Sequence, residues 1–302
     1  MNLLKKLDKI KKRIKGKITF NENLSKFSWF NIGGPAKIVY RPENIKELSF
    51  FLKEAKIKDG IKVLGLGSNT LIRDGGYNGI IIKLGKPFSH INMFSDNILV
   101  SGVSALDKQV SNFALDKSLS GFEFLLCIPG TIGGAIRMNS GCYGHDISKI
   151  LLSVQAMDLN GNIKVIPSSK IKFHYRGSDL DNDLIFISAT LKGSIINKNE
   201  IEKKMKIFSD KKQKSQPLNI KTCGSTFKNS ENKKAWELIK ESGCNGMKVG
   251  DAQISEKHCN FFVNKGSANS KDLEKLISKV KKNVFNQTGI NLELELQIIG
   301  GK

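Results

Sequence analysis

The sequence predicts an α+β fold with a larger first part and a smaller second part, on three observations. The first two thirds of the chain alternate many short apolar runs with few helical patterns. A long polar helix pattern ends at Gln216-Pro217, which we take as the domain boundary. The remainder closes with an amphipathic helix and an alternating strand. With the polar helix assigned to the second part, we expect an N-terminal basic helix in residues 1–20, a larger domain in 21–196 and a smaller α+β domain in 197–302.

Length and composition indicate a water-soluble globular protein. The chain has 302 residues, of which 39% are hydrophobic and 25% charged, as in ordinary globular domains. No apolar run approaches the roughly 18 residues of a membrane helix. The N-terminal residues lack the apolar core and cleavage site of a signal peptide. We therefore expect a cytoplasmic protein that does not insert into a membrane.

Cysteine and histidine usage argues against a metal site. The five cysteines are odd in number and contain no Cys-x-x-Cys pair, and the four histidines are separated from one another. Scattered thiols of this kind fit a reducing compartment better than a disulfide framework or a zinc centre. We expect free cysteines and no bound metal.

The formal net charge of +21 favours an anionic partner or reflects composition alone. Lysines are spread through every segment, together with many asparagines and isoleucines, as a genome-wide bias would produce. Because no basic-aromatic motif accompanies the charge, we expect no nucleic-acid partner. Arginine is scarce, with five residues, so an arginine here marks a place that needs a planar bidentate donor.

The elements are predicted in chain order from apolar spacing. A lysine-rich helix in residues 1–17 has an apolar face made by Leu3, Leu4, Leu7, Ile10 and Ile14. Two hairpins are indicated, one around Ser95-Asp96-Asn97 in residues 88–103 and one across Asn160-Gly161. The remaining helices are predicted at 43–55, 104–119, 197–216, 233–242 and 270–287. The remaining strands are predicted at 37–40, 62–64, 80–84, 151–158, 162–166, 184–191, 261–264 and 291–299.

Two glycine-rich stretches are candidates for ligand contact. Residues 121–144, GFEFLLCIPGTIGGAIRMNSGCYG, hold six glycines, and residues 65–70, GLGSNT, follow a short strand where free amides suit an anion. Missing Cβ atoms let the backbone approach a flat or phosphorylated ligand. Glycine content alone fits a tight packing turn equally well. The second stretch is not a dinucleotide GxGxxG, because no third glycine or helix follows at the required spacing.

Six segments taken together resemble one known family. They are SWFNIGGPA, GLGSNTLIRDGG, IPGTIGGAIRMNSGCYG, FHYRGSDL, CGSTFKN and the closing LELELQIIG, in this order and at suitable intervals. The pattern resembles the UDP-N-acetylenolpyruvoylglucosamine reductases, flavoenzymes that make UDP-N-acetylmuramate for bacterial peptidoglycan. The similarity covers nearly the whole chain from about residue 20 onward.

The resemblance implies an FAD-binding region of the p-cresol methylhydroxylase and vanillyl-alcohol oxidase type, followed by a smaller α+β substrate domain. It implies noncovalent FAD, since no histidine lies inside either glycine loop, and NADPH as a reductant that uses the same cleft as the substrate. The chain length fits the compact type of the family. The implied cofactor-binding residues are Gly65, Gly67, Ser68, Asn69, Pro129, Gly130, Thr131, Gly133, Gly134, Asn139 and Gly141.

Reduction of an enolpyruvyl ether requires stabilisation of the enolate as it forms, and then a proton at C2. By resemblance, Arg176 in FHYR supplies parallel N–H donors to the two oxyanions. Ser225 in CGSTFKN matches the family's proton donor. Glu295 fits the closing family pattern better than Glu293 does. Its implied role is to hydrogen-bond the enolate carboxyl or to orient water or Arg176.

The resemblance also implies substrate contacts and a substrate, UDP-N-acetylglucosamine enolpyruvate, handled by a monomer. The implied substrate-binding residues are Tyr175, Lys228, Asn229 and His258, of which the lysine and the histidine suit a diphosphate. Two alternatives stay open. Another flavin oxidoreductase on the same scaffold has no need of Ser225 and Glu295, and a non-enzymatic basic protein takes up no FAD.

Overall fold

The computed structural model describes residues 3–56 and 60–301, with side chains from Lys6 onward. The predicted apolar contacts of Leu3 and Leu4 lie outside the described side chains. The chain forms two compact units: the first takes residues up to 20, 38–65 and 79–211, and the second takes residues 21–37, 66–78 and 212–302. This division differs from the three continuous segments expected from the sequence.

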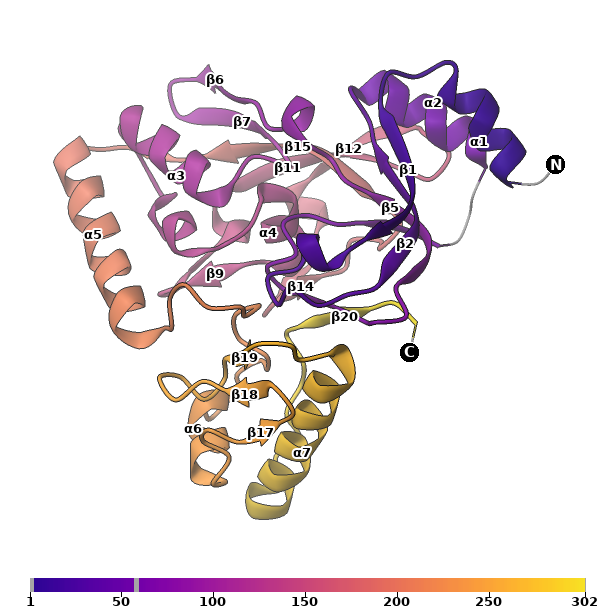
Figure 1. The fold of residues 1–302 in the computed structure, drawn as a ribbon. Helices are drawn as coiled ribbons and strands as arrows, with labels where there is room; N and C mark the ends of the chain where they lie inside the picture. Colours follow the sequence, from indigo (N-terminus) through magenta and orange to yellow (C-terminus); the bar gives the residue numbers. More distant parts are fainter. Residues whose placement is uncertain (1–2, 57–59, 302) are drawn as a thin grey trace. The chain divides into compact units, whose positions relative to one another are not determined.

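Two sheets organise the first unit (Figure 1). One has the strand order β1 (Lys17–Asn23), β2 (Pro35–Arg41), β5 (Tyr77–Ile82) and β3 (Ile61–Val63). The other is antiparallel, in the order β12 (Ile163–Pro167), β11 (Leu151–Met157), β15 (Ile185–Lys192), β7 (Ile98–Gly102) and β6 (Ile91–Ser95). Both predicted hairpins, β6–β7 and β11–β12, are confirmed.

The N-terminal helix belongs to the first unit. Helix α1 (Leu3–Lys11) and helix α2 (Ile45–Ala55) contribute to one core with the first sheet, in which Leu7, Ile10 and Phe51 are buried. The expected basic helix is therefore shorter than predicted and packs as part of the larger unit, because its apolar face has a partner there.

Three short helical segments build the core of the second sheet. Helix α3 (Asp107–Asp116), the 3-10 turn η3 (Glu123–Cys127) and helix α4 (Ile132–Met138) share a buried apolar cluster with β11 and β15. The sequence patterns did not predict α4, because its two glycines each weaken a helix by about 1 kcal/mol. Burial of Ile132, Ala135 and Ile136 outweighs that cost.

The first unit also contains several two-stranded pairs and one long helix. The pairs are β8 (Leu119–Ser120) with β16 (Ser194–Ile195), β9 (Gly141–Cys142) with β10 (His145–Asp146), and β13 (Phe173–His174) with β14 (Gly177–Ser178). Helix α5 (Lys198–Ser215) follows, and residues up to Lys211 belong to this unit.

The second unit is a small α+β domain (Figure 1). Strands β17 (Lys248–Val249), β18 (Ala252–Ile254) and β19 (Phe262–Asn264) form an antiparallel sheet that shares a core with α6 (Ala235–Glu241) and α7 (Ser270–Thr288). Strand β20 (Gln297–Ile299) pairs in parallel with β4 (Thr70–Ile72). This pairing explains why residues 66–78, far away in the sequence, belong to the second unit.

Within the described ranges, no helix is long and apolar enough to cross a membrane. The same ranges contain no cluster of three or more His, Cys, Asp or Glu side chains that could hold a metal ion. All five cysteines are free thiols.

Candidate active site

Arg176 occupies a strained turn in the first unit. It is the second residue of the two-residue turn between β13 and β14, and its φ of +58° lies in the left-handed region. A non-glycine residue pays of order 1–3 kcal/mol there. A Cβ on the following residue, Gly177, would lie 2.2 Å from Nε2 of the exposed His174 side chain. The turn therefore holds Arg176 in a conformation that its side chain disfavours.

The guanidinium of Arg176 is held from two sides. Its Nη2 donates to the carbonyl of Gly141 at 2.9 Å, and its Cζ lies 4.8 Å from the ring centre of Tyr175. Tyr175 itself is 47% exposed, so it can meet a ligand. Three residues predicted from the sequence, Arg176, Tyr175 and Gly141, are therefore in contact in the first unit.

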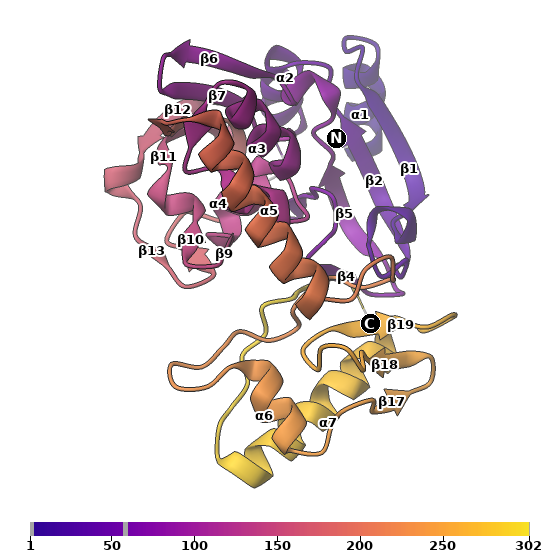
Figure 2. The same cartoon turned by 90° about the vertical axis from the view of Figure 1, so that its left-hand side faces the viewer.

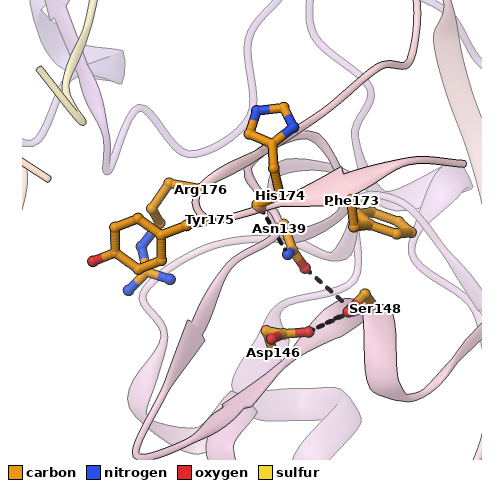
Figure 3. Close-up of a pocket in the computed structure, with 7 residues that line it drawn as sticks. All are labelled: Asn139, Asp146, Ser148, Phe173, His174, Tyr175 and Arg176. Carbon is orange, nitrogen blue, oxygen red and sulfur yellow. Dashed lines mark hydrogen bonds between the residues drawn. The ribbon is translucent and has the colours of Figure 1, made fainter. Parts of the chain in front are cut away.

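A hollow of about 330 Å³ lies beside this turn. It is lined by Asn139, Asp146, Ser148, Phe173, His174, Tyr175 and Arg176 (Figure 3). Of these, the sequence patterns indicated only Asn139, Tyr175 and Arg176. Asp146 and Ser148 lie outside the quoted motifs, and His174 lies inside FHYRGSDL but was not predicted as a site residue.

Asn139 is the link between the glycine-rich stretch and the Arg176 turn. It ends α4 in the left-handed region, with φ of +41°. Its side-chain amide donates to the carbonyl of His174 at 3.0 Å, and its Oδ1 accepts from the amide of Ser148 at 3.3 Å. Figure 3 shows it between these two partners. One amide hydrogen is left for a ligand.

Two glycines and a threonine form an open cradle in the first unit. A Cβ on Gly65 would lie 3.3 Å from Oγ1 of Thr131, and a Cβ on Gly134 would lie 3.8 Å from the same oxygen, with no nearer described atom at either position. Lys83 donates to the carbonyl of Gly65. Small residues, a hydroxyl and an ammonium group fit the phosphates and ribityl chain of FAD. The residues present therefore suit this cofactor.

Two other glycines of the long stretch, Gly130 and Gly133, are packed against protein atoms. A Cβ on Gly133 would lie 3.0 Å from the Cβ of Val103, and a Cβ on Gly130 would lie 2.7 Å from Oδ2 of Asp107. These contacts place Gly130 against the first residue of α3 and Gly133 against Val103, the residue after β7. Some glycines of this stretch therefore leave room for a ligand, and others leave room for neighbouring protein atoms. Glycine content alone does not distinguish the two.

Asp107 is a buried carboxyl group that sequence reasoning missed. Its side chain is 0% exposed, and within the described part of the chain both carboxyl oxygens lack a hydrogen-bond partner. Burial raises the pKa of Asp107 well above its ordinary value. The group is therefore neutral over a wider pH range than an exposed aspartate.

The second predicted cofactor loop belongs to the second unit from Leu66 onward. Gly67 has a φ of +68°, and a Cβ there would lie 1.9 Å from the carbonyl oxygen of Phe27. Its own carbonyl accepts from the thiol of Cys223 at 3.4 Å. Burial raises the pKa of that thiol to about 12. Ser68 follows Gly67 in this tightly packed loop.

Asn69 connects this loop to Glu295. Its side-chain amide donates to the carbonyl of Glu295 at 3.0 Å, and its own carbonyl accepts from the amide of Gln297 at 3.0 Å. Asn69 therefore holds the backbone on both sides of Leu296, just before β20.

Ser225 and Glu295 lie on adjacent segments of the second unit. The carbonyl of Thr226 accepts from the amides of both Glu295 and Leu296, at 3.0 and 3.3 Å. One acceptor facing two successive donors is the pattern of a β-bulge, which redirects side chains. The predicted strand 291–299 is therefore interrupted, and only Gln297–Ile299 remain regular.

Asn260 positions the segment that carries Ser225, and sequence patterns did not indicate it. Its side chain accepts from the amide of Phe227 at 2.9 Å and donates to the carbonyl of the same residue at 2.8 Å. Ser225 itself forms a β-bridge with Phe261. The Asn260 side chain thus pairs with the Phe227 backbone as the backbone of a neighbouring strand would. No local sequence pattern predicts this contact, because the two residues are 33 positions apart.

The predicted substrate contacts in the second unit have mixed surroundings. Lys228 lies 3.5 Å from Glu293, whose side chain is 76% exposed. Asn229 accepts from the amide of Ala235, the first residue of α6, at 3.0 Å. Burial lowers the pKa of His258, so near neutral pH its ring acts as a neutral donor and not as a cation.

Comparison with known proteins defines the class first. The family model described as an FAD binding domain matches residues 36–166. The model described as the C-terminal domain of UDP-N-acetylenolpyruvoylglucosamine reductase matches residues 216–299. The chain is thus an FAD-dependent oxidoreductase, and the expected FAD-binding region followed by a smaller α+β domain is confirmed.

Relatives over the full length then give the family. The chain is 48% identical to the UDP-N-acetylenolpyruvoylglucosamine reductase of Pelagibacter ubique over 98% of this chain and 99% of the relative. It is 42% identical to that of Orientia tsutsugamushi, over 96% and 97%. The crystal structure of the Thermus caldophilus enzyme superposes with a TM-score of 0.83 at 30% identity, covering 95% of this chain and all of the other. The chain belongs to the UDP-N-acetylenolpyruvoylglucosamine reductase family.

Proposed function

We propose that the chain reduces UDP-N-acetylglucosamine enolpyruvate to UDP-N-acetylmuramate, with NADPH as the reductant, in the synthesis of peptidoglycan precursors. Family membership supports the reaction class. The observation that carries the assignment is the pairing of the Ser225 and Glu295 segments through the Thr226 carbonyl. A flavin enzyme that oxidises an alcohol has no need of such a pair.

The first unit supplies the proposed cofactor site. Gly65, Thr131 and Gly134 would hold FAD at the open cradle, and Lys83 would add a positive charge near its phosphates. Pro129, Gly130 and Gly133 would shape the same loop from behind. When bound, FAD supplies the hydride, which it takes from NADPH.

Arg176 is proposed to stabilise the enolate of the substrate. Hydride addition to the vinyl carbon places negative charge on two oxygens of one carboxyl group. A guanidinium matches them with parallel N–H donors and stays charged at any physiological pH. A preorganised donor of this kind is typically worth about 10²–10³ in rate. The bond to Gly141 and the contact with Tyr175 preorganise the group.

Ser225 is proposed to donate the proton to C2 of the enolate. A serine hydroxyl is a weak acid, but a carbanion-like carbon is a strong base, so position matters more than acidity. The β-bridge between Ser225 and Phe261 and the two hydrogen bonds between the Asn260 side chain and the Phe227 backbone fix this segment. Glu295, redirected by the bulge, would hydrogen-bond the substrate carboxyl beside it.

The remaining contacts are proposed to hold the substrate. Tyr175, Lys228 and Asn229 present polar groups, and His258 would donate one hydrogen bond as a neutral ring. The lysine charge suits the UDP diphosphate. We expect the enzyme to act as a monomer in the cytoplasm.

The experiment that tests this function is NADPH oxidation by the purified, FAD-loaded protein. Addition of UDP-N-acetylglucosamine enolpyruvate should give rapid, stoichiometric oxidation and form UDP-N-acetylmuramate. UDP-N-acetylglucosamine, which lacks the enolpyruvyl group, is the matched control and should leave the slow background unchanged. A rate that the enolpyruvyl compound does not alter contradicts the proposal.

A further inference from the structure

The hairpin β9–β10 contains a turn that its own sequence does not favour. The two turn residues, Tyr143 and Gly144, have φ of +53° and +82°. A two-residue hairpin turn with positive φ at both positions prefers Asn-Gly or Gly-Gly, because a larger side chain is strained there. Tyr143 therefore needs a contact elsewhere that keeps it in this conformation.

Helix α5 provides that contact. The ring of Phe208 stacks on the ring of Tyr143 with centres 5.1 Å apart and planes inclined by 28°. Three residues further along the same helix face, Nζ of Lys211 lies 5.8 Å from the Tyr143 ring centre. The ring of His145 on β10 also lies 5.8 Å from Phe208. Figure 2 shows α5 beside β9 and β10.

The other end of the hairpin meets the proposed catalytic arginine. Gly141, the first residue of β9, accepts the hydrogen bond from Nη2 of Arg176 at 2.9 Å. Gly141 is itself tightly placed, since a Cβ there would lie 2.2 Å from the carbonyl oxygen of His145. A displacement of the Tyr143 turn is therefore passed to the carbonyl that orients Arg176.

We propose that Phe208 is a positioning residue for Arg176. Its ring holds Tyr143 in the left-handed region, and the hairpin so fixed presents the Gly141 carbonyl to the guanidinium. The inference rests on the proposed function, because it assumes that Arg176 stabilises the substrate enolate. The alternative is that Phe208 only fills space, because it is a partly buried residue packed against the first core.

The test separates stacking from packing with paired variants. Phe208→Leu keeps an apolar side chain but removes the ring, and Phe208→Tyr keeps the ring. Ile201→Ala is the control, because it loosens α5 two turns earlier at a buried position. Each holoenzyme is assayed for flavin reduction by NADPH, for reoxidation by the enolpyruvyl substrate and for thermal unfolding.

We expect Phe208→Leu to slow the substrate half-reaction about 10-fold, to change flavin reduction less than 2-fold, and to unfold no earlier than Ile201→Ala. Phe208→Tyr should recover most of the loss. In an Arg176→Lys background, Phe208→Leu should add less than a 2-fold further loss, because its effect passes through Arg176.

The inference is overturned if the losses of Phe208→Leu and Arg176→Lys multiply in the double variant. It is also overturned if Phe208→Leu slows both half-reactions equally, or if Ile201→Ala shows the same kinetic pattern. Its failure is distinguishable from failure of the proposed function. If Arg176→Lys alone leaves the substrate half-reaction at the wild-type rate, the catalytic assignment fails. If Arg176→Lys is slow and the Phe208 variants behave independently of it, only the positioning role fails.

Discussion

At the scale of single residues, Ser225 is the sharpest test of the chemistry. We expect Ser225→Ala to keep flavin reduction by NADPH near the wild-type rate, since that half-reaction needs no proton at C2 of the substrate. Reoxidation by the enolpyruvyl substrate should slow by about 10²–10⁴. Stopped-flow absorbance of the flavin follows both half-reactions separately.

The control for this variant is Ser230→Ala, which removes a hydroxyl from the same stretch of chain, where Ser230 bonds to the nearby backbone of Lys233. It should leave both half-reactions unchanged. Equal slowing of the two half-reactions in Ser225→Ala would show that the serine supports the fold and does not donate the proton.

Asp107 gives a prediction about stability and pH. Its position in the first turn of α3 favours a negative charge by only about 0.3–1 kcal/mol, whereas burying an unpaired charge costs several kcal/mol. Burial prevails, and the pKa of Asp107 is raised. Folding must then keep the carboxyl protonated. Below the ordinary pKa of 3.8 the carboxyl is protonated in both the folded and the unfolded chain, so folding carries no penalty from this group. The protein loses stability as the pH rises from 3.8 toward the raised pKa of the folded state.

Asp107→Asn keeps the shape and removes the titration. We expect the variant to match the wild type near pH 4 and to become the more stable protein toward pH 8. The difference should grow by at most about 1.4 kcal/mol per pH unit. Thermal unfolding of both proteins across this range measures it. If Asp107→Asn instead loses stability relative to the wild type as the pH rises from 4 to 8, Asp107 is ionised in the folded protein and its charge is stabilised there.

The arginines show what residue types can and cannot reveal. Arg73 matches the expectation of a planar donor, because it forms two bonds to Glu274 through Nε and Nη2, at 3.0 and 2.7 Å. Arg137 donates to the carbonyls of residues 180, 181 and 184. Both serve the fold. Only the motif around Arg176 separated it from them, because such partners come from distant parts of the chain.

At the scale of elements, local signals were predicted well and non-local ones were not. The hairpin at Asn160-Gly161 was predictable because two adjacent residues determine its turn. Helix α4 was missed because glycines argue locally against a helix, and burial outweighs them. The bulge at Glu295 depends on a carbonyl of Thr226 far upstream, so alternation alone implied one unbroken strand.

The loop before β4 offers a test of steric demand at this scale. Gly67 and Gly246 share a φ of +68°, but only at Gly67 would a Cβ collide, at 1.9 Å from a backbone oxygen. Gly246→Ala should cost about 1–2 kcal/mol for the left-handed backbone alone. Gly67→Ala should cost about 1–3 kcal/mol more, because the loop must shift. Denaturant unfolding of the two variants measures the difference. Equal losses would contradict the packing described for this loop.

At the scale of the whole molecule, the sequence suggested continuous domains, whereas the chain builds its second unit from three segments. The cause is specific: β20 pairs with β4, and Asn264 donates to the carbonyl of Phe30 at 2.9 Å. Neither contact leaves a local trace in the sequence. The two units divide the proposed chemistry, with Arg176 in the first and Ser225 and Glu295 in the second.

The net charge of +21 leads to the last prediction. NADPH and the UDP substrate are both polyanions, so a positive field should raise their rates of association by about 10-fold or more at low salt. The Debye length falls from about 30 Å at 0.01 M to about 8 Å at 0.15 M ionic strength. We therefore expect kcat/KM for NADPH to fall several-fold over this range, while kcat changes much less. Initial rates in sodium chloride measure this, and sucrose at equal viscosity is the control. A flat profile of kcat/KM would mean that the lysines reflect composition and do not steer the substrates, because screening acts on any field that extends beyond the surface.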